Sequence, residues 1–159
     1  MSCLIRSLPV LLALLVTHRG AAVFGGDTTL EQRERFVLSE INRLRAEQGL
    51  SQLRLNSELC SIARNHSFNM AKYGYLSHRD SLGRDFGERL ASKIAAPYQA
   101  GENVGRNNFP DSARVVVEDW CQSPNHLKNI LNKRFAETGI GVAVDSDGLV
   151  FFTQIFMGK

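Results

Sequence analysis

The stretch WCQSPNHLKNIL, from Trp120 to Leu131, marks the end of one helix and the start of another. Ser123 followed by Pro124 is typical of a helix N-terminus, because a serine hydroxyl can cap backbone N–H groups and proline needs no partner at the first helical position. His126 then falls in the first turn, where the positive end of the helix dipole disfavours the imidazolium form. Such a histidine either acts as a metal ligand or proton acceptor, or simply closes the corner between two helices.

The chain begins with a segment typical of secreted proteins. Arg6 precedes a short apolar run, and small residues follow it. This pattern predicts a signal peptide at residues 1–22, then a short segment at 23–29 and a single domain at 30–158. No stretch reaches the roughly 20 apolar residues of a membrane-spanning helix. We therefore expect a secreted, extracellular protein without a membrane span.

The charge balance restricts the possible partners. The full chain carries 19 Lys and Arg against 16 Asp and Glu. The predicted signal peptide contains Arg6 and Arg19 but no acid, so the remainder is nearly neutral, with a net charge of about +1. A near-neutral surface of mixed charge provides no electrostatic basis for binding nucleic acid or an anionic membrane. We expect a monomer without nucleic-acid partners.

The cysteines allow two interpretations. Cys3 lies in the predicted signal peptide, which leaves Cys60 and Cys121. An even pair in an oxidising compartment predicts a disulfide, which would close a loop of about 61 residues and stabilise the fold by roughly 4 kcal/mol in the chain-entropy model. The alternative is a pair of buried thiols, since each cysteine lies on the apolar face of a predicted helix.

Apolar residues at helical spacing predict five helices. The first begins with a capping box, in which Thr28 is the cap and Glu31 reaches back to it. The second is capped by Asn56 and ends at Gly74. The others are expected at residues 86–91, after a cap formed by Asp111-Ser112, and from Ser123 to near Asn132.

Two residues of the second helix carry additional signals. His66 lies in its apolar stripe, where a lone histidine is more often a hydrogen-bonded core residue than a ligand. Asn65-His66-Ser67 also forms an N-glycosylation sequon, which is a weak signal inside a helix. We therefore predict a structural role for His66 and record Asn65 as a glycosylation candidate.

Two strands are predicted at the end of the chain. Apolar residues alternate over 140–144, a turn follows, and a β-branched and aromatic run extends over 149–156. Apolar side chains on both sides of the last strand indicate that it is covered on both faces. Earlier in the chain, residues 100–105 hold a glycine-flanked pair of polar residues. Either the glycines let the backbone pass close to another element while Glu102 points into a site, or the segment is a turn with an exposed Glu102.

Several short motifs occur in a fixed order. They are Asn42-x-x-Arg45, the helix from Leu59 to Ala71, Ser77-His78, Gly101-Glu102-Asn103-Val104, Trp120 with Ser123-Pro124-x-His126, Asn129-Ile130-Leu131, Gly139-Ile140-Gly141-Val142 and Thr153-Gln154. Together they resemble the CAP superfamily, or SCP domain, which includes cysteine-rich secretory, venom allergen-like and pathogenesis-related proteins. The resemblance is strongest to bacterial-type members and covers roughly residues 30–156.

This resemblance implies an α+β fold, an α-β-α sandwich in which helices cover both faces of a small antiparallel sheet. It also implies a central cavity in which two histidines and two acids meet. His78, His126 and Glu102 match three of these positions. In animal members the second acid lies at the position that Ser123 occupies here, so only three of the four cavity residues are present.

The resemblance further implies a metal site. Two imidazoles and a carboxylate are the ligand set of an open zinc site, so His78, His126 and Glu102 are predicted to hold zinc or another divalent metal. Glu102 can equally orient one histidine through a hydrogen bond. Three further residues are expected to support the cavity: Asn103, Trp120 and Ser123.

Three functions are consistent with these residues. The first is a binding module, whose cavity holds a divalent metal and whose grooves take a lipid, sterol or peptide ligand. The second is a metal-assisted, protease-like hydrolase, for which Ser77 and Ser123 are nucleophile candidates by sequence proximity alone. The third is a structural or interaction domain whose cavity residues form a polar core. The serine at position 123 favours binding over catalysis.

Overall fold

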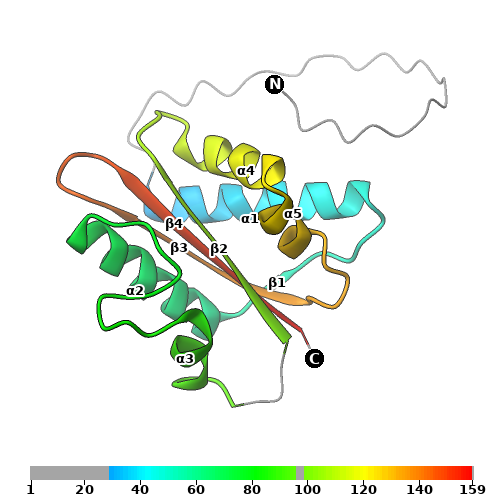
Figure 1. Ribbon diagram of the computed structural model, residues 1–159. Helices are drawn as coiled ribbons and strands as arrows, with labels where there is room; N and C mark the ends of the chain where they lie inside the picture. Colours follow the sequence, from blue (N-terminus) through cyan, green and yellow to red (C-terminus); the bar gives the residue numbers. More distant parts are fainter. Residues whose placement is uncertain (1–28, 96–98, 159) are drawn as a thin grey trace.

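The computed structural model describes residues 29–95 and 99–158 (Figure 1). The predicted signal peptide, with Cys3, lies outside the described residues. The helices are α1 (Leu30–Glu47), α2 (Ser57–Tyr73), α3 (Phe86–Ala91), α4 (Ser112–Gln122) and α5 (Pro124–Ile130). The strands are β1 (Arg54–Leu55), β2 (Gln99–Asn107), β3 (Glu137–Val144) and β4 (Val150–Gly158).

The strands form one sheet in the order β1-β3-β4-β2. β4 pairs antiparallel with both β3 and β2, so that Gly141 and Asn103 lie opposite Thr153 and Gln154, respectively. β1 contributes two residues parallel to β3. The predicted α+β sandwich is confirmed, but the sheet is mixed rather than wholly antiparallel.

Helices cover both faces of the sheet (Figure 1). α1, α4 and α5 pack against the face that carries Phe152 and Phe156. α2 and α3 pack against the other face, where Leu59 and Leu90 contact Ile155. All residues of β4 from 150 to 156 are buried, because successive side chains point to opposite faces of the sheet and a helix layer covers each face. The predicted coverage on both faces is therefore confirmed.

α2 and β3 are in backbone contact at two glycines. A Cβ atom on Gly139 would lie 2.1 Å from the carbonyl carbon of Leu59, and one on Gly141 would lie 2.1 Å from the backbone nitrogen of Arg64. Any larger residue would force the helix away from the strand. The Gly-Ile-Gly-Val motif therefore sets the distance between α2 and the sheet.

Three of the predicted caps differ from the structure, and one of them is Asp111, whose side chain makes no capping hydrogen bond at the start of α4. The capping box of α1 consists of Thr29 and Gln32, one residue later than the predicted pair, Thr28 and Glu31. The cap of α2 is confirmed, since Asn56 accepts from two backbone N–H groups.

Ser123 begins α5, as predicted, but its hydroxyl makes no capping hydrogen bond. The same residue also ends α4, and its N–H donates to the carbonyl of Asp119 at 3.1 Å. With two helices meeting at one residue, the backbone orientation of Ser123 is fixed from both sides. The predicted hydroxyl cap is therefore wrong, although the helix boundary is right.

Cys60 and Cys121 are not joined by a disulfide. Cys60 belongs to α2, on one face of the sheet, whereas Cys121 is buried in the core formed with α1 and α4 on the other face. A disulfide requires Cα atoms within about 7 Å of each other, and here the sheet lies between the two helices. The predicted disulfide is therefore wrong.

Residues 100–105, for which the sequence left open a turn with an exposed Glu102, form the middle of β2, and Glu102 is buried. A Cβ atom on Gly101 would lie 2.8 Å from Oδ1 of Asn129, and one on Gly105 would lie 2.5 Å from a methyl group of Val116. The two glycines thus make room for α5 and α4 on an extended strand.

Candidate functional site

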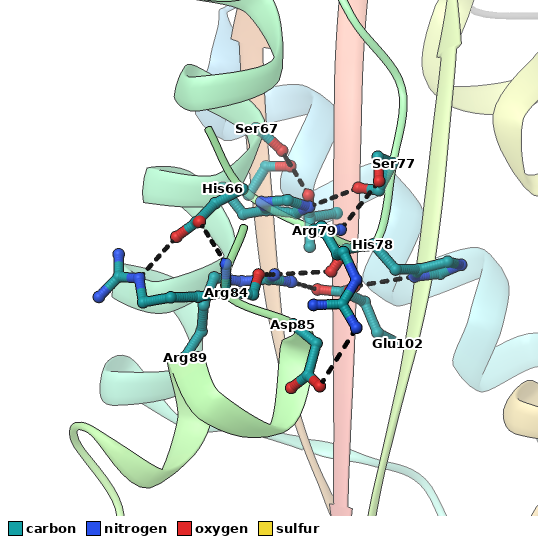
Figure 2. A network of polar contacts seen from close by, with 12 residues as sticks. His66, Ser67, Ser77, His78, Arg79, Arg84, Asp85, Arg89 and Glu102 are labelled. Atoms are coloured by element: carbon teal, nitrogen blue, oxygen red, sulfur yellow. Dashed lines mark hydrogen bonds and ion pairs between the residues drawn. The ribbon is translucent and has the colours of Figure 1, made fainter. Parts of the chain in front are cut away.

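Glu102 projects from β2 into a buried network on the α2–α3 side of the sheet (Figure 2). Its side chain is 2% exposed, and both of its oxygens are engaged. Oε1 lies 2.9 Å from Nδ1 of His78, and Oε2 accepts from Nη2 of Arg89 at 2.5 Å. An ionised carboxylate only accepts hydrogen bonds, so His78 carries its proton on Nδ1. Its Nε2 is therefore available to a ligand, on a side chain that is 53% exposed.

Arg89 was not predicted from the sequence. It lies on α3, is 6% exposed, and donates through Nη1 to the carbonyl of His78 at 2.7 Å as well as to Glu102. α3 is held in place by a capping box and by Leu90, which is fully buried. One sequence signal could have indicated that Arg89 is buried. It directly precedes Leu90 in a helix that is too short to have a wide polar face.

His66 is the core residue that the sequence predicts. It is 1% exposed, and its Nε2 lies 2.8 Å from the carbonyl oxygen of Ser77. Since a carbonyl only accepts, Nε2 carries the proton, and the buried Nδ1 has no partner among the described residues. Burial lowers the pKa of His66, because the charged form loses its hydration. His66 thus anchors the residue before His78.

His126 lies in the first turn of α5, as predicted. Burial lowers the pKa of His126, because the charged form loses its hydration, and the charge of His78 lowers it further. The ring centroids of His126 and Trp120 are 6.5 Å apart, at an interplanar angle of 58°. The carbonyl of His126 accepts from Nδ2 of Asn103 at 3.2 Å.

Two of the predicted support residues, Asn103 and Trp120, fix α5 and α4 to β2. Oδ1 of Asn103 accepts from Nδ2 of Asn129 at 2.9 Å, and the same nitrogen lies 3.2 Å from the carbonyl oxygen of Glu102. Nε1 of Trp120 donates to the carbonyl of Val104 at 3.0 Å. These bonds place the start of α5, with His126, beside the strand that carries Glu102.

Glu102 is fully hydrogen-bonded at the predicted metal site. Both oxygens of Glu102 are occupied, by His78 and Arg89. Within residues 29–95 and 99–158, no group of three or more His, Cys, Asp or Glu side chains is arranged to hold a metal ion. With both oxygens hydrogen-bonded, Glu102 has the contacts of an orienting group, the alternative that the sequence left open. The half-buried Ser123 supplies no carboxylate.

A separate groove of about 410 Å³ lies between α1 and the start of α4. Its lining combines apolar and charged side chains, among them Phe36, Pro110, Ala113, Arg33, Arg35, Asp111 and Arg114. Arg114 pairs with Asp111 and Glu118, and Arg35 pairs with Glu31. Two polar atoms at this groove, Oγ of Ser112 and Nε of Arg33, are buried without a hydrogen-bond partner among the described residues. His126 follows the other end of α4, about 16 Å away along a helix of this length.

The glycosylation candidate lies on α2. Asn65 is exposed, but the hydroxyl of Ser67 is buried, 2.9 Å from the carbonyl oxygen of Gly141 and 2.8 Å from Oγ1 of Thr153. In the folded domain the sequon hydroxyl thus contacts the sheet. Glycosylation of Asn65 stays a prediction.

Comparisons with known proteins place the chain in a family. A family model described as CAP, the cysteine-rich secretory protein family, matches residues 38–156. Two curated proteins of Bacillus subtilis (strain 168) are similar: the uncharacterized protein YkwD, 33% identical over 127 residues, and the uncharacterized membrane protein YlbC, 31% identical over 126 residues. Each match covers 79% of this chain, but only 47% of YkwD and 34% of YlbC. The chain therefore spans between a third and a half of these relatives.

Solved structures share the fold. An outer surface protein from Borrelia burgdorferi superposes with a TM-score of 0.74 at 18% identity, over 82% of this chain and 96% of that protein. An extracellular protein containing an SCP domain, from Bacillus anthracis str. Ames, gives a TM-score of 0.69 at 27% identity, over 82% of this chain and 43% of that protein.

In the described part of this chain, none of the helices is both long and apolar enough to span a bilayer.

Proposed function

Since the chain belongs to the CAP family of cysteine-rich secretory proteins, we propose that it is a secreted binding module with two sites. One is a metal site formed by His78 and His126, and the other is the groove between α1 and α4. Export through the predicted signal peptide at 1–22 is part of this proposal. Among the described residues, neither Ser77 nor Ser123 makes a hydrogen bond to an imidazole through its hydroxyl, so we do not extend the proposal to hydrolysis.

The observation that carries the metal site is the hydrogen bond from His78 to Glu102. Metal-binding histidines commonly donate one ring N–H to a carboxylate, which fixes the tautomer and raises the basicity of the other nitrogen. Glu102 gives His78 this arrangement, and His126 lies close by with a lowered pKa that favours its neutral form. A solved structure of similar fold, that of NaASP2 with Zn2+, superposes with a TM-score of 0.59 at 12% identity. A bound divalent metal would supply Lewis acidity and open coordination positions.

The metal site predicts a zinc affinity that depends on both histidines. In calorimetric titrations at pH 7.5, we expect one zinc ion to bind per chain, with the affinity reduced at least about tenfold in His78→Ala and in His126→Ala. Asn125→Ala is the matched control, because Asn125 is exposed on the same turn of α5. A double histidine variant that binds zinc like the wild type would contradict the site.

The groove supports a second ligand class, an amphiphile with an anionic head. Its volume is within the usual range for small-molecule sites, roughly 300–1,000 Å³. Unpaired buried polar groups are costly, so Ser112 Oγ and Arg33 Nε favour a ligand that accepts hydrogen bonds and whose binding moves the side chains covering these atoms. Arg33, which pairs with no carboxylate among the described residues, favours a negative charge on that ligand, whereas Arg35 and Arg114 are already paired with acids. Of the three ligand classes expected from the sequence, a lipid with an acidic head matches these features better than an uncharged sterol.

Hexadecanoate is a suitable probe for the groove. We expect the wild type to bind it and the double variant Arg33→Gln/Arg35→Gln to bind it at least about tenfold more weakly, since two charge-assisted contacts are lost. Arg43→Gln is the matched control, because Arg43 is exposed on α1 outside the groove. Equal binding by all three proteins would contradict the groove assignment and leave the metal site unaffected.

A further inference from the structure

One guanidinium group connects the parts that orient His78. Arg89 donates through Nη2 to Oε2 of Glu102 and through Nη1 to the carbonyl of His78 itself (Figure 2). It therefore holds both the main chain of His78 and the carboxylate that receives the proton of its ring. His66 adds a further anchor, at the carbonyl of Ser77.

The Arg89–Glu102 pair is almost completely buried, at 6% and 2% side-chain exposure. Two charges in such surroundings are tolerated only when each is well paired, since neither can recover its hydration. Glu102 consequently cannot turn toward an approaching metal ion without leaving Arg89 unpaired. A planar donor group also fixes the plane of the carboxylate, which a lysine ammonium does not.

We propose that Arg89 is the positioning residue of the metal site. It holds Glu102 as the hydrogen-bond acceptor of His78 Nδ1, keeps this carboxylate out of the coordination shell, and presents His78 Nε2 as the ligand atom. The inference rests on the proposed metal site and specifies its ligand set as two histidines, with α3 as the element that orients one of them.

The tautomer of His78 tests this inference without any metal. In long-range ¹H–¹⁵N spectra of the metal-free protein, we expect His78 to carry its proton on Nδ1 in the wild type and to show a mixture of both tautomers in Arg89→Gln. The zinc affinity of Arg89→Gln should fall by about 10–100-fold, the usual effect of removing an outer-sphere partner. Arg89→Lys, which keeps the charge, should recover part of both properties. Arg79→Gln is the control, since Arg79 is an exposed residue of the same loop.

Glu102→Gln provides an independent measurement if Arg89→Gln does not fold. Because Arg89 only donates, it should bind the amide oxygen of the new side chain and turn the amide NH₂ toward His78. His78 should then carry its proton on Nε2, the reverse of the wild type. An unchanged tautomer in Glu102→Gln, or wild-type tautomer and zinc affinity in Arg89→Gln, would overturn the inference.

The two proposals fail in different ways. If the tautomers respond as described but the wild type binds no zinc, the metal site is wrong, and only the control of the His78 tautomer by Arg89 stands. If zinc binding depends on His78 and His126 but not on Arg89, the metal site stands and the role of Arg89 is wrong.

Discussion

At the scale of single residues, His66 and His78 have different roles because their ring nitrogens meet different acceptors. His66 is enclosed and bound to the neutral carbonyl of Ser77, so it serves as an anchor. His78 is half exposed and bound to the charged carboxylate of Glu102, which polarises its ring toward a ligand on the open side. The same residue type thus supports the loop at one position and is available for binding at the other.

His66 should make folding stability sensitive to mild acid. Burial lowers its pKa in the folded state, so below the unfolded-state pKa of about 6.5 the unfolded chain binds the proton more readily. This contribution to stability is present above pH 6.5 and is lost as the pH falls through the lowered folded-state value. We expect the urea midpoint to fall between pH 7.5 and pH 5.0, and to fall less in His66→Gln.

Measuring only above pH 5.0 separates the stability lost through His66 from the stability lost when carboxylates are protonated. Burial acts to raise the pKa of Asp80, but hydrogen bonds from Arg84 and Leu82 outweigh it and lower the pKa overall, so the stability contributed by Asp80 is lost only in stronger acid. Because the pKa of His126 is also lowered, the urea midpoint of His66→Gln should still fall between pH 7.5 and pH 5.0, but by less than that of the wild type. Identical decreases in wild type and His66→Gln would contradict the assignment.

At the scale of elements, the contact between α2 and β3 depends on the absence of side chains at two positions. We expect Gly139→Ala to destabilise the fold by at least about 3 kcal/mol, because its Cβ would overlap the backbone of α2. Urea unfolding would measure this. Gly87→Ala is the matched control: its Cβ would meet only a side-chain oxygen, at 3.4 Å, and alanine in a helix is favoured by up to about 1 kcal/mol. Similar losses in both variants would contradict the packing argument.

The elements that could be predicted are those whose signals are local. The spacing of apolar residues within α2 and α4, and the turn between β3 and β4, are contained in the segments themselves. β2 could not be predicted, because the need for glycine at 101 and 105 comes from helices that follow later in the chain. The short β1 is likewise defined by its partner β3 rather than by its own two residues.

The candidate site was predictable to a similar extent. His78, Glu102 and His126 follow from the resemblance to a family, and their interactions follow from the structure. Two features are evident only from the three-dimensional structure. One is the buried Arg89, which lies 13 residues before its partner Glu102, and the other is the occupation of both oxygens of that carboxylate. Charge pairing across elements has no local pattern in a sequence, so the sequence alone leaves open the choice between ligand and orienting group.

At the scale of the whole molecule, an ion pair connects the two helix layers. Glu34 of α1 accepts from Nε and Nη2 of Arg64 of α2, at 2.8 and 2.5 Å, although these helices cover opposite faces of the sheet. Because the backbone of Arg64 contacts Gly141 in β3, the pair passes the edge of the sheet beside that strand. The short β1 pairs with only two residues of β3, so this edge is otherwise little covered by strands.

A double-mutant cycle measures this connection. With Glu34→Gln and Arg64→Gln, we expect a coupling of about 1 kcal/mol in urea unfolding, limited by the half-exposed arginine and reduced by salt. The exposed pair Arg43–Glu47 on α1 is the matched control, with a coupling of about 0.5 kcal/mol or less. A coupling no larger than that of the control would contradict the connecting role.

The outer edge of β2 has a consequence for the protein in concentrated solution. An edge strand usually presents unpaired carbonyl and N–H groups on which a strand of another molecule can assemble. Here the carbonyls of Glu102 and Val104 already accept from the side chains of Asn129 and Trp120. The bonds that position the candidate site therefore also occupy two carbonyls to which another strand would pair. Substituting Asn129 or Trp120 would free these carbonyls as a template for fibrous self-association.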